Sequence, residues 1–299
     1  MKKNLFILMA LVLFAFTSCQ KFAGDPISQV FSIDGTYTEL RVEDSFDVFV
    51  SDTATLVTVT AGENVMPNVV VEINDNTLEI YLKGWHSSRG EDMIVILPYN
   101  ADLNTVVLSG TSTFESDYGL SSENIQVELS GASGFTCNFE SFSSNVTLSG
   151  ASEFHGKVDT YRVNIKLSGA SDYFGDMQAT EVSMDLDGSS TIQGNVYASD
   201  LSLVMSGASD ATLGGHVTKL DMDLSGASTI VKTVVDGYYG FACYQCTGKM
   251  SGASKAYIHC NDNITVDLSG GSDLHFTGNA FTGDCTTSGG SHIIHDENP

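Results

Sequence analysis

The sequence predicts an all-β fold: a right-handed parallel β-helix (solenoid) of about ten 19-residue coils, with an N-terminal β capping region. The first observation behind this prediction is a repeated motif, Ser-Gly-Ala-Ser or a close variant. The second is the alternation of apolar and polar residues around each copy, and the third is the shortage of good helix formers within the copies. Six of the nine intervals between copies are 19 residues, and the copies begin at Ser109, Ser130, Ser149, Ser168, Asp187, Ser206, Ser225, Ser251, Ser269 and Ser288.

Alignment of the copies on this motif places apolar residues in rows. The positions one and three before the motif are apolar in most copies, whereas the position between them is mostly polar, as at Lys166 and Asp185. Period-two alternation is typical of a strand with one buried face. A second apolar row stands five positions after the motif start and runs from Phe114 to Ile293. A third, weaker row nine positions after it includes Phe139, Val158, Met177, Val196 and Val234.

Other repeat architectures fit less well. Leucine-rich repeats need their own Leu and Asn framework, and propeller blades need about twice this length. The remaining architecture is a parallel solenoid, and the crossover rule for parallel strands favours right-handed winding. The motif glycine indicates a corner with positive φ. The closing serine, from Ser112 to Ser291, is expected to be a structural hydroxyl, because a row of nucleophiles would need a repeated base beside it.

The chain is expected to divide into a leader, a tether, a capping region and a column. Residues 31–107 have the pattern of strands without the exact repeat, and we expect irregular first coils or a capping sheet there, since the open end of a solenoid needs a cap. The repeats proper are expected over residues 108–293, followed by a tail over residues 294–299.

Residues 1–18 have the features of a bacterial lipoprotein signal peptide. A positively charged start precedes an apolar run over residues 5–16, which at about 1.5 Å per residue is too short to cross a ~30 Å hydrocarbon core. The Thr-Ser-Cys sequence that ends at Cys19 resembles a lipobox, so we expect Cys19 to be lipidated and residues 19–30 to form a tether. Ordinary secretion, with cleavage just before the cysteine, is the alternative.

The charge balance excludes some partners. With 13 Lys and Arg against 37 Asp and Glu, the formal net charge is −24. Nucleic-acid binding needs clustered basic residues, so no nucleic acid is expected as a partner. An anionic membrane surface would also repel the chain, and membrane attachment is expected only through the N-terminal lipid.

Five cysteines follow Cys19, an odd number for an exported chain, so at least one is expected to be free or paired between chains. Cys243 and Cys246 have the spacing of a redox dithiol, but the strand-to-helix context of a thioredoxin site is absent from the sequence around them. A local disulfide between these two, closing an inserted loop, is the favoured interpretation over zinc binding. No metal or cofactor is expected.

A row of carboxylates is one candidate site. The position four after the motif start aligns Glu153 and Asp172 on adjacent coils, with Asp210 two coils further on. Adjacent coils would hold the first pair roughly 5 Å apart at the backbone, and β-helical polysaccharide lyases and hydrolases use clustered carboxylates. No Arg or Lys shares this row near the pair, which favours a solvated acidic face. Weak Ca²⁺ binding would lack a loop that wraps the ion.

An aromatic insertion is the other candidate site. The 26-residue interval after Ser225 indicates seven extra residues near Cys243 and Cys246. Loops on rigid scaffolds often bind ligands, and exposed aromatic rings suit carbohydrate stacking. Packing of the rings against the column as a local lid is the equal alternative. The aromatic residues concerned are Tyr238, Tyr239, Phe241 and Tyr244.

Several segments together resemble a known family. They are Phe46-Asp-Val-Phe-Val50, Asn76-Thr-Leu-Glu-Ile80, Ile94-Val-Ile-Leu-Pro98 and the repeated Leu-Ser-Gly-Ala-Ser. This ensemble is similar to the head GIN domain family of autotransporter adhesins, found in lipoproteins of Bacteroidetes, and the similarity extends over about residues 31–293. The resemblance implies a β-helical fold and an envelope or surface role, and it supplies no catalytic residues.

The sequence therefore favours a non-catalytic interaction or adhesion module, held in the cell envelope as an outer-membrane lipoprotein on the periplasmic face or the cell surface. Its expected partner is a surface ligand: a glycan, a matrix component or an envelope protein. The alternative is a glycan-acting hydrolase or lyase that uses Glu153 and Asp172. The candidate binding face comprises Glu153, Asp172, Asp210, Tyr238, Tyr239, Phe241 and Tyr244.

Overall fold

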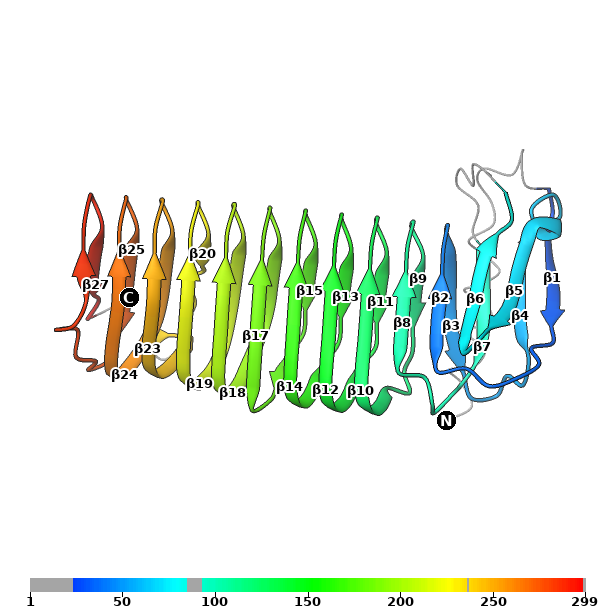
Figure 1. The fold of residues 1–299 in the computed structure, drawn as a ribbon, viewed down its shortest axis with the longest axis horizontal. Coiled ribbons are helices and arrows are strands. Elements are labelled where there is room, and N and C mark those ends of the chain that lie inside the picture. The colour runs from blue at the N-terminus through cyan, green and yellow to red at the C-terminus, as the bar shows by residue number, and fades with distance from the viewer. Residues whose placement is uncertain (1–23, 85–92, 236, 298–299) are drawn as a thin grey trace.

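A computed structural model describes residues 24–84, 93–235 and 237–297 of the chain. The described residues form a β-solenoid in which like strands of successive coils lie side by side along one straight column (Figure 1). The only helix in this part of the chain is a 3₁₀ turn, η1 (Met66–Asn68). The expected signal peptide and Cys19 lie outside the described residues.

Each regular coil consists of a long strand, a tight corner at the repeated motif and a short strand. In one coil these strands are β12 (Phe139–Leu148) and β13 (Glu153–His155), and in the next they are β14 (Val158–Leu167) and β15 (Asp172–Phe174). β12 pairs in parallel with β14, and each residue faces its counterpart 19 positions later. The predicted repeat is therefore one coil of the solenoid.

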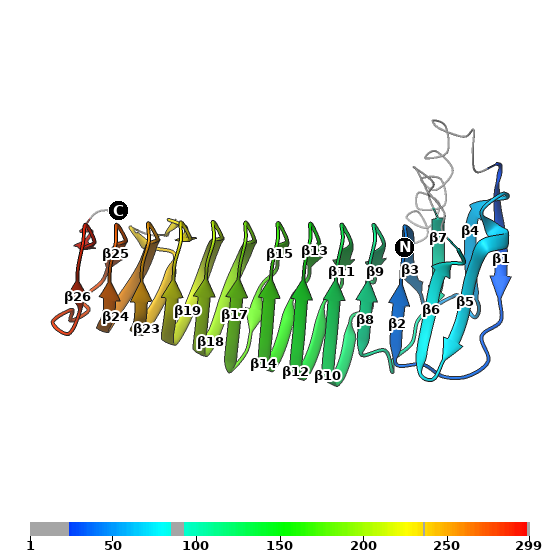
Figure 2. The same ribbon diagram turned by 45° about the horizontal axis from the view of Figure 1, so that its top comes forward.

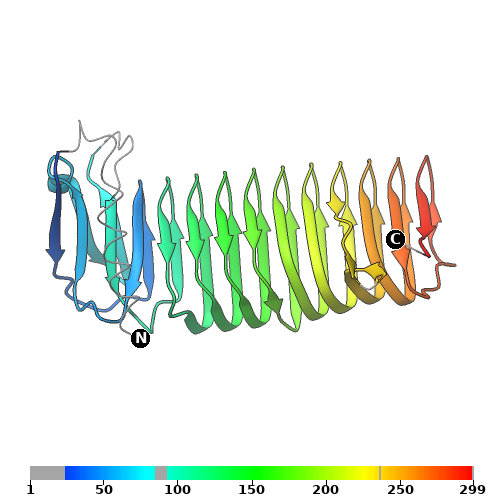
Figure 3. The same cartoon turned by 180° about the vertical axis from the view of Figure 1, so that it is seen from behind.

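In three coils the strands merge, giving β18 (Thr191–Met205), β19 (Asp210–Leu224) and β24 (Lys255–Leu268). From β8 onward the coils follow chain order along the column, as the view from behind also shows (Figure 3). The other strands of the column are β8 (Thr105–Leu108), β9 (Thr113–Glu115), β10 (Leu120–Leu129), β11 (Gly134–Thr136), β16 (Met177–Gln178), β17 (Glu181–Leu186), β20 (Thr229–Ile230), β23 (Phe241–Met250), β25 (Asp273–Thr277), β26 (Thr286–Thr287) and β27 (His292–His295).

The two main apolar rows are confirmed as the core of the column. Leu129, Leu148, Leu167 and Leu186 are buried and stand in register on successive strands. In the second row, four aromatic rings stack in sequence. The centroid distances are 5.3 Å for Phe114–Phe135, 5.2 Å for Phe135–Phe154 and 4.6 Å for Phe154–Tyr173. Stacked rings add to the hydrophobic free energy gained by burying these side chains.

The corner glycines explain why the motif is so regular. All ten adopt φ between 70° and 80°, a conformation that side chains rarely tolerate. At each corner the next amide donates to the carbonyl of the corner one coil earlier, as from Ser189 to Gly169 at 2.7 Å. A Cβ on Gly188 would lie 2.5 Å from that carbonyl oxygen. Glycine is thus required at each corner for two reasons: the positive φ and the close approach of the neighbouring backbone.

One coil of the column lies before the first motif and carries no copy of it. β2 (Glu39–Val42) and β3 (Phe46–Ser51) turn at Asp44, a non-glycine residue with φ of 71°. β2 pairs in parallel with β8, and β3 pairs in parallel with β9, so residues 39–51 extend the column below the first motif coil.

The N-terminal end is closed by strands that depart from chain order (Figure 2). β6 (Thr77–Leu82) and β7 (Met93–Pro98) pair in parallel with β2 and β3 on their outer side. Beyond them the pairing becomes antiparallel, through β1 (Pro26–Phe31), β4 (Val57–Gly62) and β5 (Val69–Asn74). No helix among the described residues is long and apolar enough to span a membrane.

The insertion lies earlier in the chain than expected. It forms a hairpin of β21 (Val234–Val235) and β22 (Tyr238–Tyr239), and the regular path resumes at Phe241. The placement of Val234 in the third apolar row is wrong, because Val234 is in the hairpin and 46% exposed, whereas Phe241 is buried and faces Gly215 of the previous coil. The sequence interval gave the length of the insertion but not its position.

The expected disulfide between Cys243 and Cys246 is also absent. All five cysteines in the described part of the chain are free, and these two lie in β23 with their side chains in the core. A bond between them would close no loop, because the inserted hairpin ends before β23 begins. Cys243 instead faces Cys260 of the next coil. A hydrogen bond with the Cys246 thiol, together with burial, raises the pKa of Cys243 well above its usual value.

Replacement of a corner glycine tests the backbone constraint. Gly188→Ala should lower the free energy of unfolding by about 2 kcal/mol or more, because it adds strain at positive φ and a clash with the Gly169 carbonyl. Gly134→Ala is the matched control: its Cβ would lie 3.6 Å from Thr113 Cγ2, an ordinary contact, so stability should change by less than about 1 kcal/mol. Urea unfolding of both variants measures the difference, and equal midpoints would contradict the role of the corner.

Thiol titration tests the state of the cysteines. Burial raises the pKa of Cys137 to about 11, and the hydrogen bond with Cys243 together with burial raises the pKa of Cys260. Since the thiolate is the reactive form, an aromatic disulfide reagent at pH 8 should label these groups very slowly in the folded chain. In guanidinium without reductant, a chain that begins at Gln20 should show five reactive thiols. A count of three would indicate a disulfide after all.

Candidate functional site

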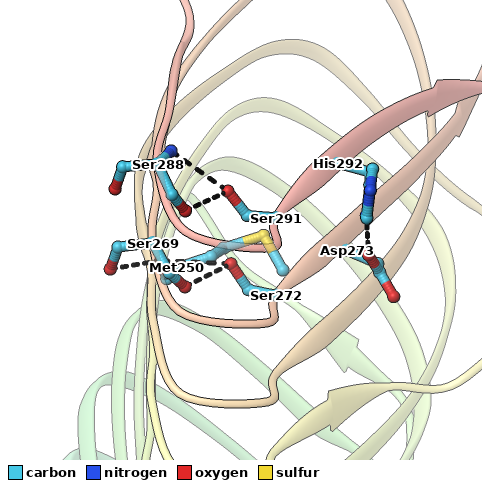
Figure 4. Close-up of polar contacts among 7 residues, drawn as sticks. All are labelled: Met250, Ser269, Ser272, Asp273, Ser288, Ser291 and His292. Carbon is cyan, nitrogen blue, oxygen red and sulfur yellow. Dashed lines mark hydrogen bonds and ion pairs between the residues drawn. The ribbon is translucent and has the colours of Figure 1, made fainter.

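The buried serine row is structural. Ser272 Oγ donates to the carbonyls of Ser269 at 3.0 Å and Met250 at 3.3 Å, and Ser291 Oγ donates to the carbonyl of Ser288 at 2.9 Å. Figure 4 shows these hydroxyls turned toward the corner backbone, away from His292. His292 Nδ1 instead contacts Asp273 Oδ1 at 3.0 Å. These hydroxyls therefore stabilise the corners through hydrogen bonds to the backbone.

The carboxylate row exists as the repeat predicted. Glu153 of β13 faces Asp172 of β15 directly across a parallel pair, followed by Thr191 and then Asp210. Glu153 and Asp210 are exposed and Asp172 is half-buried. The ring of His155 lies beside this row, with Nε2 at 3.4 Å from Glu153 Oε2.

The geometry limits what this row can do chemically. Glu153 and Asp172 project from the same side of one sheet, so both reach a ligand from the same direction. A glycosidase acid and its partner instead flank the scissile bond from two sides. In the described residues, no three His, Cys, Asp or Glu side chains are grouped so as to hold a metal ion. The arrangement suits contact with a ligand that lies along the column.

The hairpin of the insertion is fixed to the column by Tyr239. Its ring is only 3% exposed and meets Tyr257 edge-on, with centroids 5.5 Å apart. Its backbone amide donates to Thr277 Oγ1 at 3.3 Å, and Lys232 Nζ lies 5.6 Å from the ring centroid. The hairpin is therefore attached to the coils that follow it in the chain.

A hydrogen-bonded group completes this attachment. The Tyr239 hydroxyl donates to the carboxylate of Asp296, which His275 Nδ1 also contacts at 2.9 Å. Burial and the hydrogen bond with Asp296 raise the pKa of Tyr239. Burial alone would raise the pKa of Asp296, but the hydrogen bonds from Tyr239 and His275 hold it below its usual value. The C-terminal segment thus helps to position the hairpin.

The aromatic residues of the candidate face are consequently separated. Tyr239 and Phe241 are buried, so the expectation of exposed rings is wrong for these two. Tyr239 packs against the column as in the lid alternative, whereas Phe241 belongs to β23 and the column core. Tyr244 is 55% exposed on β23, away from the hairpin. Tyr238 belongs to β22, and its side chain is not among those described. The four residues do not form one aromatic surface.

Sequence analysis missed a different aromatic pair. Phe142 and Tyr161 are exposed, and their rings stack with centroids 5.1 Å apart and an interplanar angle of 2°. The signal was available, because the two residues are 19 positions apart and therefore occupy the same phase of adjacent coils. It was overlooked because most of the other copies carry polar residues at this phase, such as Thr180 and Ser199, although Tyr244 shares it.

One solved structure, from Parabacteroides merdae, shares the fold of this chain. No curated protein matches the chain. A "putative adhesin" from Parabacteroides merdae ATCC 43184 has a TM-score of 0.50 and 17% identity, covering 91% of this chain and 97% of that one. A "putative adhesin" from Parabacteroides distasonis ATCC 8503 has a TM-score of 0.47 and 18% identity, covering 91% of this chain and 95% of that one. A "putative lipid binding protein" from the same organism has a TM-score of 0.46 and 15% identity, covering 91% of this chain and 97% of that one.

A sequence family matches most of the chain. Its description is "Putative auto-transporter adhesin, head GIN domain", and the two overlapping matches extend over residues 36–193 and 165–280. They include the motif-free coil, the carboxylate row and the insertion. This protein therefore belongs to the head GIN domain family of auto-transporter adhesins, as the repeated Leu-Ser-Gly-Ala-Ser and the strands before it implied.

Proposed function

We propose that this protein is a non-catalytic adhesion module of the bacterial cell envelope, attached to the outer membrane by a lipid on Cys19. The observation that carries this proposal is the display of exposed side chains in register on a rigid column. Phe142 stacks on Tyr161 and Glu153 stands beside Asp172, each pair on neighbouring coils. Such a surface contacts an extended ligand over a long area, as solenoid proteins do.

Family membership supports the same role. The family description names adhesion, and two of the similar solved structures are titled as adhesins. A surface ligand, either a glycan, a matrix component or an envelope protein, is the proposed partner. A tether over residues 19–30 would leave the column free to reach it from the membrane.

Replacement of Cys19 tests the anchor. Cys19→Ser removes the thiol that would carry the lipid, so the protein should move from the membrane fraction to the soluble fraction of the envelope. Fractionation of cells that express each form, followed by immunoblotting, measures the shift. Ser18→Ala is the control and should stay membrane-bound. A membrane fraction unchanged by Cys19→Ser would contradict lipid attachment.

The hydrolase or lyase alternative is tested with the carboxylate pair. The wild-type chain and a Glu153→Gln, Asp172→Asn double variant are each incubated with a panel of neutral and acidic polysaccharides. We expect no new reducing ends or unsaturated products from either protein, because the two carboxylates lie on one side of any bound chain. Product formation by the wild type that disappears in the double variant would establish the enzyme and overturn the adhesion-only role.

A further inference from the structure

An open cleft lies between the hairpin and the sheet of the preceding coils. It has a volume of about 600 Å³. Strands β18 and β19 form its floor, and Thr233, Val235 and Gly240 form the wall on the hairpin side. Tyr239 of the hairpin also lines the cleft, and its contacts with Tyr257 and Thr277 fix the hairpin to the later coils.

The floor of the cleft is open because its backbone is glycine-rich. A Cβ on Gly194 would lie 2.0 Å from the carbonyl oxygen of Gly175, and one on Gly215 would lie 2.4 Å from that of Val196. Only glycine therefore fits at these two positions, and no side chain from either of them occupies the cleft. The cleft is a built feature of these two coils and does not depend on the rotamer of a long side chain.

The side chains around the floor are hydrogen-bonding groups and two exposed rings, those of Tyr197 and His216. Gln193 and Thr212 face each other in register on β18 and β19. Tyr197 is 45% exposed, and its ring meets that of His216 edge-on with centroids 5.5 Å apart. Amide and hydroxyl groups beside an aromatic ring can bind the hydroxyls and the apolar face of a sugar.

The charge of the lining narrows the ligand class. The described residues that line the cleft include no Asp, Glu, Lys or Arg, although the whole chain carries 37 acidic residues. The described lining residues offer a cation no carboxylate, and a polyanion would be repelled by the surrounding protein. A neutral ligand with many hydroxyl groups fits both conditions.

We propose that this cleft binds a neutral saccharide. The inference rests on the proposed adhesion function and deepens it, by assigning one ligand class to one place on the column. Attachment of the hairpin through Tyr239 and Asp296 forms the cleft before the ligand arrives, which reduces the entropy cost of binding. Tyr197 is the ring on which the sugar stacks, and Gln193 and Thr212 bind its hydroxyls.

Affinity electrophoresis of the full chain tests this assignment. Native gels contain one neutral polysaccharide each (mannan, starch, a mixed-linkage β-glucan or a galactan) or the polyanion polygalacturonate. We expect at least one neutral polysaccharide to slow the protein, and polygalacturonate not to slow it. Tyr197→Ala should weaken binding about tenfold, the change expected for loss of about 1.4 kcal/mol of ring contact. Thr212→Arg, which fills the cleft, should abolish it.

Tyr99→Ala is the matched control, because Tyr99 is 45% exposed like Tyr197, contacts one other ring (Tyr118, centroids 5.5 Å apart) and lies outside the cleft. Each variant is checked for an unchanged thermal unfolding midpoint. Failure of every neutral polysaccharide to slow the chain overturns the proposal, and so does retardation that Tyr197→Ala and Thr212→Arg leave unchanged. Binding of the same variants to whole cells is measured in parallel. Cell binding that all three variants retain would leave the adhesion role in place without this site.

Discussion

The hydrogen bond between successive corners is the constraint on which the rest of the structure depends. The amide after each corner glycine reaches the carbonyl of the corner one coil earlier, and only a residue without a Cβ permits that approach at positive φ. This contact fixes the register of adjacent coils. Once the register is fixed, the leucine row and the Phe114 to Tyr173 stack follow, because residues 19 positions apart must meet. The same register places exposed side chains in rows.

The sequence was informative wherever the period was kept. The apolar rows and the neighbouring positions of Glu153 and Asp172 followed from counting residues, since each coil repeats the path of the last. Counting residues did not predict the structure where the backbone departs from the 19-residue repeat. The extra residues could have been placed before or after Phe241, because aromatic residues stand on both sides of it: Tyr238 and Tyr239 before it and Tyr244 after it. The coil at residues 39–51 could not be aligned with the repeats, because Asp44 occupies the corner where the other coils have glycine.

The candidate sites were harder to predict than the fold, because burial decides which side chains can meet a ligand. The sequence shows four aromatic residues in and after the insertion. It does not show that the Tyr239 hydroxyl donates a hydrogen bond to Asp296, which lies 57 positions later. It also does not show that glycines on β18 and β19 open a cleft beside the hairpin. Both features depend on contacts between segments outside the repeat register.

The position of residues 39–51 has a consequence for folding during synthesis. This coil lies between β6–β7 and β8–β9, all of which come later in the chain. When it leaves the ribosome, neither neighbouring coil has yet been translated, so both of its edges lack partners. Every coil from β10 onward instead emerges after the edge on which it docks. The slow event in assembly is thus expected at the start of the column, before any motif coil can be added to it.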